Sequence, residues 1–113
     1  MRHARLAVVV ATALAITTAR AAADDPQPSR ERELVRLVRQ DCGACHGMTL
    51  KGGLGPALLP DALRDKPAES LRATILRGRP GTAMPPWQGM LSETDADWIV
   101  KYLLAGFPRE AVR

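Results

Sequence analysis

The segment Cys42-Gly43-Ala44-Cys45-His46 constrains this chain more than any other part of its sequence. It places two cysteines three positions apart and a histidine directly after the second. Residues i and i+3 lie on one side of a helical turn, so both thiols and the imidazole can face one group. The pattern C-x-x-C-H is the attachment signal of c-type haem. We therefore predict that Cys42 and Cys45 form thioethers with one haem c and that His46 ligates its iron.

Three other uses of this motif are less consistent with the rest of the sequence. A redox dithiol of the thioredoxin type requires a βαβ pattern, and no alternating strand pattern is visible. A zinc ion needs two further ligands, and His46 is the only histidine outside the first 23 residues. A structural disulfide suits an oxidising compartment, but it leaves the histidine without a role.

Residues 1–23 are predicted to be a secretory signal peptide. Arg2 and Arg5 precede an uncharged stretch of 14 residues from Leu6 to Ala19, and small residues follow it. A membrane-spanning helix needs about 20 apolar residues, so this stretch is too short for one, although retention as an uncleaved anchor is an alternative. We expect a periplasmic protein without stable membrane insertion, with a mature domain over residues 24–113.

The charge and the composition exclude one class of function and favour a cofactor. Three of the 16 basic residues and none of the 12 acidic ones lie in the leader, which leaves the mature part with a net charge of +1. A nucleic-acid-binding protein shows a concentrated basic face, so we expect no nucleic-acid partner. The chain has only two Trp, one Tyr and one Phe. A small domain with so few large side chains lacks core volume, and a haem would supply it.

The apolar pattern predicts an all-α domain with three main helices. Two segments rich in glycine and proline, residues 47–60 and 79–89, are expected to be loops between them. The expected helices begin at Arg30 with Ser29 as cap, run from near Pro67 to Gly78, and run from a Ser92–Asp95 cap to Gly106, with a short helix around Asp61 to Leu63.

Counting the histidines and methionines of the mature chain narrows the candidates for the second iron ligand. One histidine in the mature chain excludes bis-histidine ligation, and electron carriers commonly pair histidine with methionine. Met48 lies two residues from His46 and would have to wrap around the ring edge. Met84 is followed by two prolines, which fix the backbone. We predict Met84 as the ligand, with Met90, which could instead fill the core, as the main alternative.

The order of these features resembles that of small class I cytochromes c. The resemblance spans about Glu33 to Gly106 and rests on Cys42-x-x-Cys45-His46-Gly47, Gly55-Pro56-x-Leu58 and Ala83-Met84-Pro85 before a final helix. Two longer segments are more narrowly similar to the cytochrome c55X group. They are Gly53-Leu54-Gly55-Pro56-Ala57-Leu58 and Gly78-Arg79-Pro80-Gly81-Thr82-Ala83-Met84-Pro85-Pro86-Trp87.

The resemblance implies a class I cytochrome c fold around one covalently bound haem, with His46 and Met84 as the iron ligands. It also implies that the Pro56 carbonyl accepts a hydrogen bond from the His46 imidazole, which would fix the ring. Leu34 and Val38 stand where the family often has a glycine and an aromatic residue. We therefore expect the terminal helices to cross less closely, or at a different angle, than in the family pattern.

The resemblance to the cytochrome c55X group implies a function in denitrification. That group comprises small periplasmic cytochromes associated with haem-d1 nitrite reductase. We expect a monomeric one-electron carrier, not an enzyme, that supplies electrons to this reductase or to other redox partners. The alternative is an accessory protein for haem-d1 maturation or insertion into the reductase. A ligand sensor with a displaceable Met84 is a third interpretation.

Overall fold

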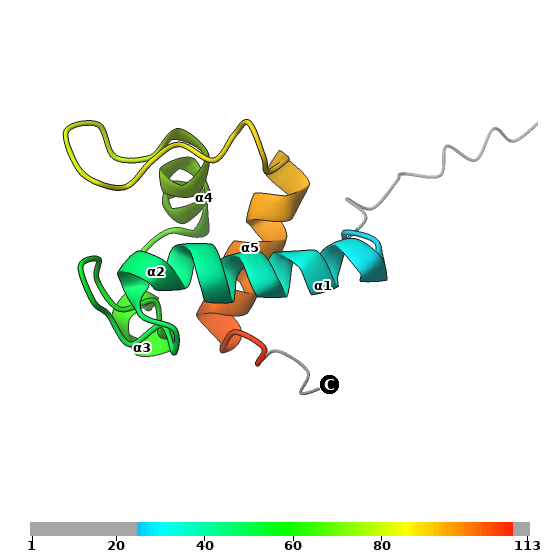
Figure 1. Ribbon diagram of the computed structural model, residues 1–113, viewed down its shortest axis with the longest axis horizontal. Coiled ribbons are helices and arrows are strands. Elements are labelled where there is room, and N and C mark those ends of the chain that lie inside the picture. Colours follow the sequence, from blue (N-terminus) through cyan, green and yellow to red (C-terminus); the bar gives the residue numbers. More distant parts are fainter. Residues whose placement is uncertain (1–24, 110–113) are drawn as a thin grey trace, which may run out of the picture.

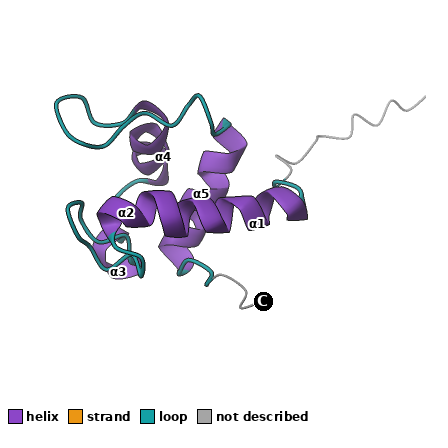
Figure 2. Cartoon of the chain, in the orientation of Figure 1, coloured by secondary structure: helices purple, strands orange, loops and turns teal. Residues whose placement is uncertain are grey.

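The structure, a computed structural model, describes residues 25–109, so the predicted signal peptide lies outside the described residues. This part contains no strand and consists of α1 (Pro28–Leu37), η1 (Val38–Cys42), α2 (Gly43–His46), α3 (Pro60–Leu63), α4 (Ala68–Arg77) and α5 (Glu93–Ala105). Figures 1 and 2 show α1, η1 and α2 as one continuous rod that crosses α5. None of these helices is long and apolar enough to span a membrane. The predicted all-α architecture, with three main helices and two loops, is confirmed.

The helix ends follow the predicted signals, except at the start of α1. This helix begins at Pro28, and no side chain caps it. The predicted cap by Ser29 is therefore wrong, because a proline with its preset φ opens the helix instead. At α5, the Ser92 hydroxyl accepts the Asp95 N–H at 3.0 Å and the Asp95 carboxylate accepts the Ser92 N–H at 3.1 Å. This pair is the predicted capping box.

One turn of the rod, just where the rod reaches the cysteine motif, is wider than an α-helical turn. Val38–Cys42 form a π-helix, in which the N–H of Gly43 donates to the carbonyl of Val38, five residues earlier. Such turns are rare and often occur at functional sites. This turn could not be predicted from the sequence, because its residue pattern does not differ from that of an α-helix.

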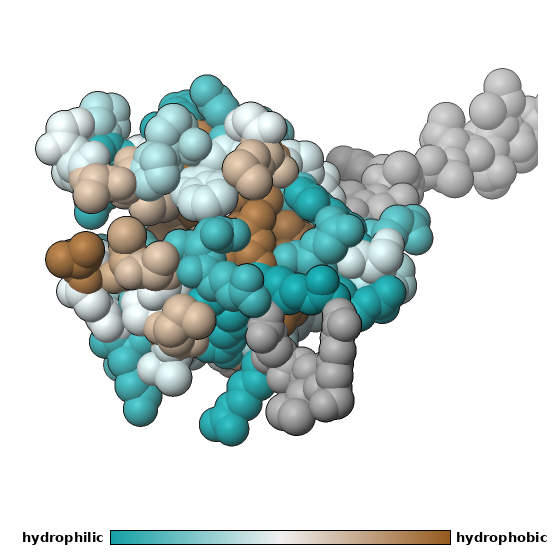
Figure 3. Space-filling view, viewed as in Figure 1, coloured by the Kyte–Doolittle hydropathy of each residue, from teal (hydrophilic) through white to brown (hydrophobic). Residues whose placement is uncertain are grey.

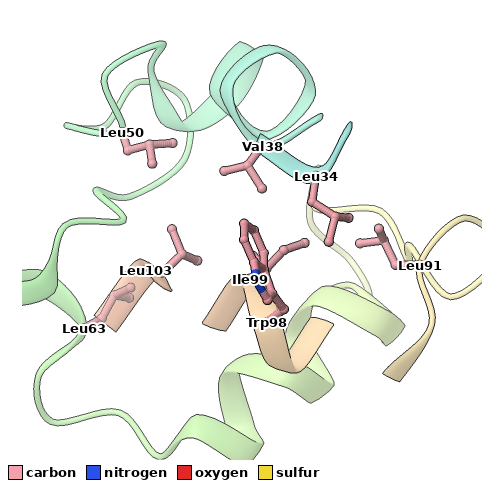
Figure 4. Close-up of a cluster of buried hydrophobic side chains, with 8 residues drawn as sticks. All are labelled: Leu34, Val38, Leu50, Leu63, Leu91, Trp98, Ile99 and Leu103. Carbon is pink, nitrogen blue, oxygen red and sulfur yellow. The ribbon is translucent and has the colours of Figure 1, made fainter. Parts of the chain in front are cut away.

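The hydrophobic core forms where α1 crosses α5. Leu34 of α1 and Val38 of η1 pack with Trp98 and Ile99 of α5, and none of the four is more than 3% exposed (Figure 4). Full burial of an aliphatic side chain of this size stabilises a fold by about 1.5–3 kcal/mol. Leu34 and Val38 are four residues apart, so they lie on one face of the rod, and this is the face that packs on α5.

Two arginines of the rod form hydrogen bonds with the C-terminal part of the domain. The guanidinium of Arg30 donates to both carboxylate oxygens of Asp95, at 3.3 and 2.9 Å. Arg39 donates to the carbonyl oxygens of Phe107, at 2.8 Å, and of Pro108, at 2.9 Å, and it lies over the Phe107 ring. These contacts hold the rod across α5 and so fix the place of the motif at its end.

Candidate functional site

A cavity of about 500 Å³ lies among the end of the rod, α4, α5 and the two loops. Figure 3 shows apolar side chains in a hollow between α4 with its following loop and the rod that crosses below them. Cofactor pockets commonly measure about 300–1,000 Å³, so this cavity is large enough for an apolar cofactor. Its walls include five members of the hydrophobic core, namely Val38, Leu63, Leu91, Ile99 and Leu103.

The cavity brings together all four residues predicted to hold the haem. Cys42, Cys45 and His46 reach it from the end of the rod, and Met84 reaches it from the loop after α4. Both cysteines are free thiols and half-buried. Figure 1 shows the two loops at the same end of the molecule, where α2 also ends.

The three methionines in the described part of the chain differ in exposure and in whether they line the cavity. Met84 is half-buried and lines the cavity. Met48 and Met90 are 61% and 64% exposed, and neither lines it. Met90 therefore does not fill the core, the alternative role considered for it, and Met84 is the methionine that faces the same space as His46.

The loop after the motif holds the imidazole of His46. The Nδ1 atom lies 2.7 Å from the carbonyl oxygen of Pro56. Because a carbonyl only accepts, Nδ1 carries the proton and Nε2 keeps a lone pair that can bind a metal. A Cβ added to Gly55 would lie 2.7 Å from the ring carbon Cε1. The expected hydrogen bond to Pro56 is present, and Gly55 leaves the ring room to make it.

A sharp reversal after His46 places this loop. Gly47 has a φ of 87°, which favours glycine because other residues lack easy access to this region. Beyond it, the N–H of Gly52 donates to the carbonyl of His46, and the N–H of Gly55 donates to that of Cys45, both at 2.8 Å. The helix end thus binds the loop that returns over the imidazole.

The loop that carries Met84 is bound to the other helix end, that of α4. The N–H groups of Trp87 and Gln88 donate to the carbonyls of Ile75 and Leu76, each at 3.1 Å. The last carbonyls of a helix lack partners within it, and here the returning loop supplies them.

Gly78 lets the Met84 loop approach α4 closely. This residue ends the helix with a φ of 67°. A Cβ at Gly78 would lie 2.6 Å from the carbonyl oxygen of Met84, and that same oxygen accepts the N–H of Arg79 at 3.1 Å. A larger residue at position 78 would therefore displace the backbone of Met84.

The charged groups lie at the rim of the cavity. Asp41, Lys66 and Arg79 line it and are exposed to water. Burial raises the pKa of the Cys42 thiol to about 11, and the Asp41 carboxylate adds to the rise. At neutral pH this thiol is therefore uncharged, as its apolar surroundings require.

The residues present fit a c-type haem. An imidazole, a thioether and two thiols surround an apolar space, and these are the groups that attach such a haem and ligate its iron. The fold and this site together define a small c-type cytochrome.

Comparisons with known proteins give the same class and a narrower group. Residues 29–103 match the family model described as cytochrome c oxidase, cbb3-type, subunit III. A cytochrome c55X of Pseudomonas aeruginosa is 59% identical over 83 residues, which are 74% of this chain and 70% of the relative. A solved structure of the c-type cytochrome NirC is 59% identical, with a TM-score of 0.71, over 72% of this chain and 95% of that one.

The chain belongs to the c-type cytochromes and, within them, to the cytochrome c55X family. It is an electron-transfer protein with covalently bound haem c, not an enzyme, as the sequence predicted. A further similarity is to a solved structure titled dihydro-heme d1 dehydrogenase NirN in complex with DHE. The identity is 44% and the TM-score 0.59, over 68% of this chain but 17% of that one. This chain therefore resembles one part of a larger protein.

Thr82 is a residue of the site that no sequence motif indicated. Its hydroxyl donates to the carbonyl of Arg79 at 2.7 Å and accepts the N–H of Met84 at 3.3 Å. Threonine hydroxyls often bond to nearby backbone groups, and this tendency was the available signal. Nothing in the sequence indicates which backbone groups such a hydroxyl will join.

Proposed function

We propose that this chain is a periplasmic one-electron carrier whose haem is attached to Cys42 and Cys45 and ligated by His46 and Met84. The observation that carries the proposal is a single apolar cavity lined by all four of these residues. When bound, the haem supplies an iron that alternates between two oxidation states. The chain attaches the group, orients the two ligands and keeps water from it.

His46 and Met84 have different tasks in this proposal. The hydrogen bond from Nδ1 of His46 to Pro56 orients the imidazole ring and leaves the lone pair of Nε2 to bind the iron. It also increases the basicity of Nε2. The thioether of Met84 would be the second protein ligand of the iron, and such ligation raises the reduction potential relative to a second histidine. An iron held by both residues would not be open to exogenous ligands, as suits a carrier.

The periplasmic location rests on residues 1–23. The positive start, the short apolar stretch and the small residues after it support removal of a signal peptide. Mass spectrometry of the protein purified from periplasm tests this: the mature chain should begin close to residue 24. A chain that retains Met1 would contradict the assignment.

We propose haem-d1 nitrite reductase as a redox partner, with contact at the mouth of the cavity. Leu54, which lines the cavity, is 93% exposed. The cations Lys66 and Arg79 and the carboxylate of Asp41 lie on the same lining, which gives its rim a net positive charge. An apolar contact with such a rim fits a partner whose docking face is apolar with an acidic rim, and such association slows as salt screens the charges.

Stopped-flow mixing of the reduced chain with oxidised haem-d1 nitrite reductase tests this partner. We expect oxidation of the haem c to slow as ionic strength rises and to slow further in Leu54→Ala. Leu59→Ala is the matched control, because Leu59 is also exposed but does not line the cavity. No oxidation by the reductase at any salt concentration would remove the partner assignment.

A second function is supported by one observation, the similarity to part of the dihydro-heme d1 dehydrogenase. It favours an accessory role in haem-d1 maturation or insertion. Binding of the chain to reductase with and without haem d1 separates the two functions. A clear preference for the reductase that lacks haem d1 would support the accessory role, whereas equal binding would favour the carrier.

A further inference from the structure

Residues 79–84 close a small ring at the end of α4. The N–H of Arg79 donates directly to the carbonyl of Met84 at 3.1 Å. In a hydrogen-bonded antiparallel pair the reverse bond is also direct. Here the hydroxyl of Thr82 stands in its place: it accepts the N–H of Met84 at 3.3 Å and donates to the carbonyl of Arg79 at 2.7 Å.

Thr82 is itself fixed within this ring. Its own N–H donates to the same Arg79 carbonyl at 3.0 Å, so the hydroxyl is held close to that oxygen. The backbone of Met84 is then held at both of its polar groups. Its carbonyl meets Arg79 and the tightly packed Gly78, and its N–H meets Thr82.

We propose that Thr82 is a positioning residue for Met84, whose hydroxyl bridge keeps the methionine thioether on the iron. This inference rests on the proposed function, in which Met84 is an iron ligand. The ring lies in an exposed loop, and such loops are more mobile than the helices they connect. Without the bridge, the amide of Met84 loses its partner in the chain, and the thioether leaves the iron more often.

The experiment is a spectroscopic titration of the oxidised, haem-loaded chain with imidazole, which competes with the thioether for the iron. Thr82→Val keeps the side-chain shape and removes the hydroxyl, whereas Thr82→Ser keeps the hydroxyl. We expect imidazole to bind Thr82→Val about fivefold more tightly than wild type, as the loss of one ordinary hydrogen bond implies. Thr82→Ser should stay within about twofold of wild type, and Met84→Ala should bind imidazole far more tightly.

Ser92→Ala is the control for a general loss of stability. It removes the cap of α5 outside the ring of residues 79–84. This variant should melt at a lower temperature than wild type and bind imidazole with wild-type affinity. A rise in affinity confined to Thr82→Val and Met84→Ala would locate the effect in the ring.

The outcomes separate the inference from the function on which it rests. Wild-type affinity in Thr82→Val, beside tight binding in Met84→Ala, would overturn the role of Thr82 and leave Met84 as the ligand. Equal tightening in Thr82→Val and Thr82→Ser would also overturn it, since the hydroxyl would not matter. Wild-type affinity in Met84→Ala would overturn both assignments. If Thr82→Val does not accumulate with haem, Thr82→Ala removes the same hydroxyl and is measured in its place.

Discussion

The Nδ1 atom of His46 lies 2.7 Å from the carbonyl oxygen of Pro56. This contact joins the last helical residue of the rod to the loop that returns over it. It determines which ring nitrogen carries the proton, and so which nitrogen can bind a metal. The ring of Pro56 restricts its φ, which limits how far this carbonyl can move.

Gly55→Ala is expected to disturb this contact. The new methyl group would lie 2.7 Å from the imidazole carbon and would push the ring away from Pro56. We expect a loss of about 1–3 kcal/mol in the free energy of unfolding of the haem-loaded protein, measured with denaturant. Gly89→Ala is the control, because an added Cβ there meets nothing within 4 Å. Equal stability of the two variants would contradict the close packing of the ring.

The core of α1 and α5 can be tested with two leucines of opposite exposure. Leu34 is fully buried, whereas Leu54 is 93% exposed. Leu34→Ala should therefore lower the free energy of unfolding by about 2–5 kcal/mol, and Leu54→Ala should change it by less than about 0.5 kcal/mol. Similar losses in thermal melts of the two variants would show that Leu34 is not a core residue.

The ion pair of Arg30 and Asp95 predicts a pH dependence of stability. Burial acts to raise the pKa of Asp95, but hydrogen bonds from Arg30 and Ser92 outweigh it, and the pKa lies below its ordinary value. A carboxyl of this kind stabilises the fold above its unfolded pKa of about 3.9. The contribution is lost as the pH falls through the lower folded pKa.

Arg30→Gln should thus reduce the free energy of unfolding by about 1 kcal/mol at neutral pH, and by progressively less below about pH 4. Arg72→Gln is the matched control, since its ion pair with Asp97 at 3.2 Å is more exposed. Its effect should be smaller and should depend less on pH. A deficit in Arg30→Gln that persists undiminished in strong acid would contradict the role given to Asp95.

The chain without its haem is expected to be largely unfolded. Loss of the haem would leave the apolar walls of a cavity of about 500 Å³ open to water, and burial of apolar surface is the main term that stabilises a fold. Total stabilities of domains are only about 5–15 kcal/mol. Circular dichroism of the Cys42→Ala, Cys45→Ala double variant, prepared without haem, checks this. A native-like helical spectrum would show that the core does not depend on the cofactor.

Local signals explain what the sequence could predict. The cysteine motif and the Ser92–Asp95 capping box each depend on residues close together in the chain, so both could be placed in advance. The sequence favoured Met84 as the iron ligand but left Met90 open as the alternative, because each follows a segment rich in glycine or proline. Burial separates them: Met84 faces the cavity, and Met90 is 64% exposed.

Other local features carry no signal that could be recognised in the sequence. The π turn of Val38–Cys42 has no residue signature, and Ser29 is displaced as a cap by the neighbouring Pro28. The bridge made by Thr82 exists only once residues 79 and 84 face each other across the loop. Sequence patterns identify the groups in these cases but not their partners.

The optical spectrum of the reduced, haem-loaded protein, recorded with and without carbon monoxide, tests the central claim most directly. If His46 and Met84 both ligate the iron, the low-spin spectrum of the wild type and of Met90→Leu will not change on addition of carbon monoxide. Met84→Ala will bind carbon monoxide and shift. A wild-type protein that shifts as Met84→Ala does would contradict a closed, two-ligand electron carrier.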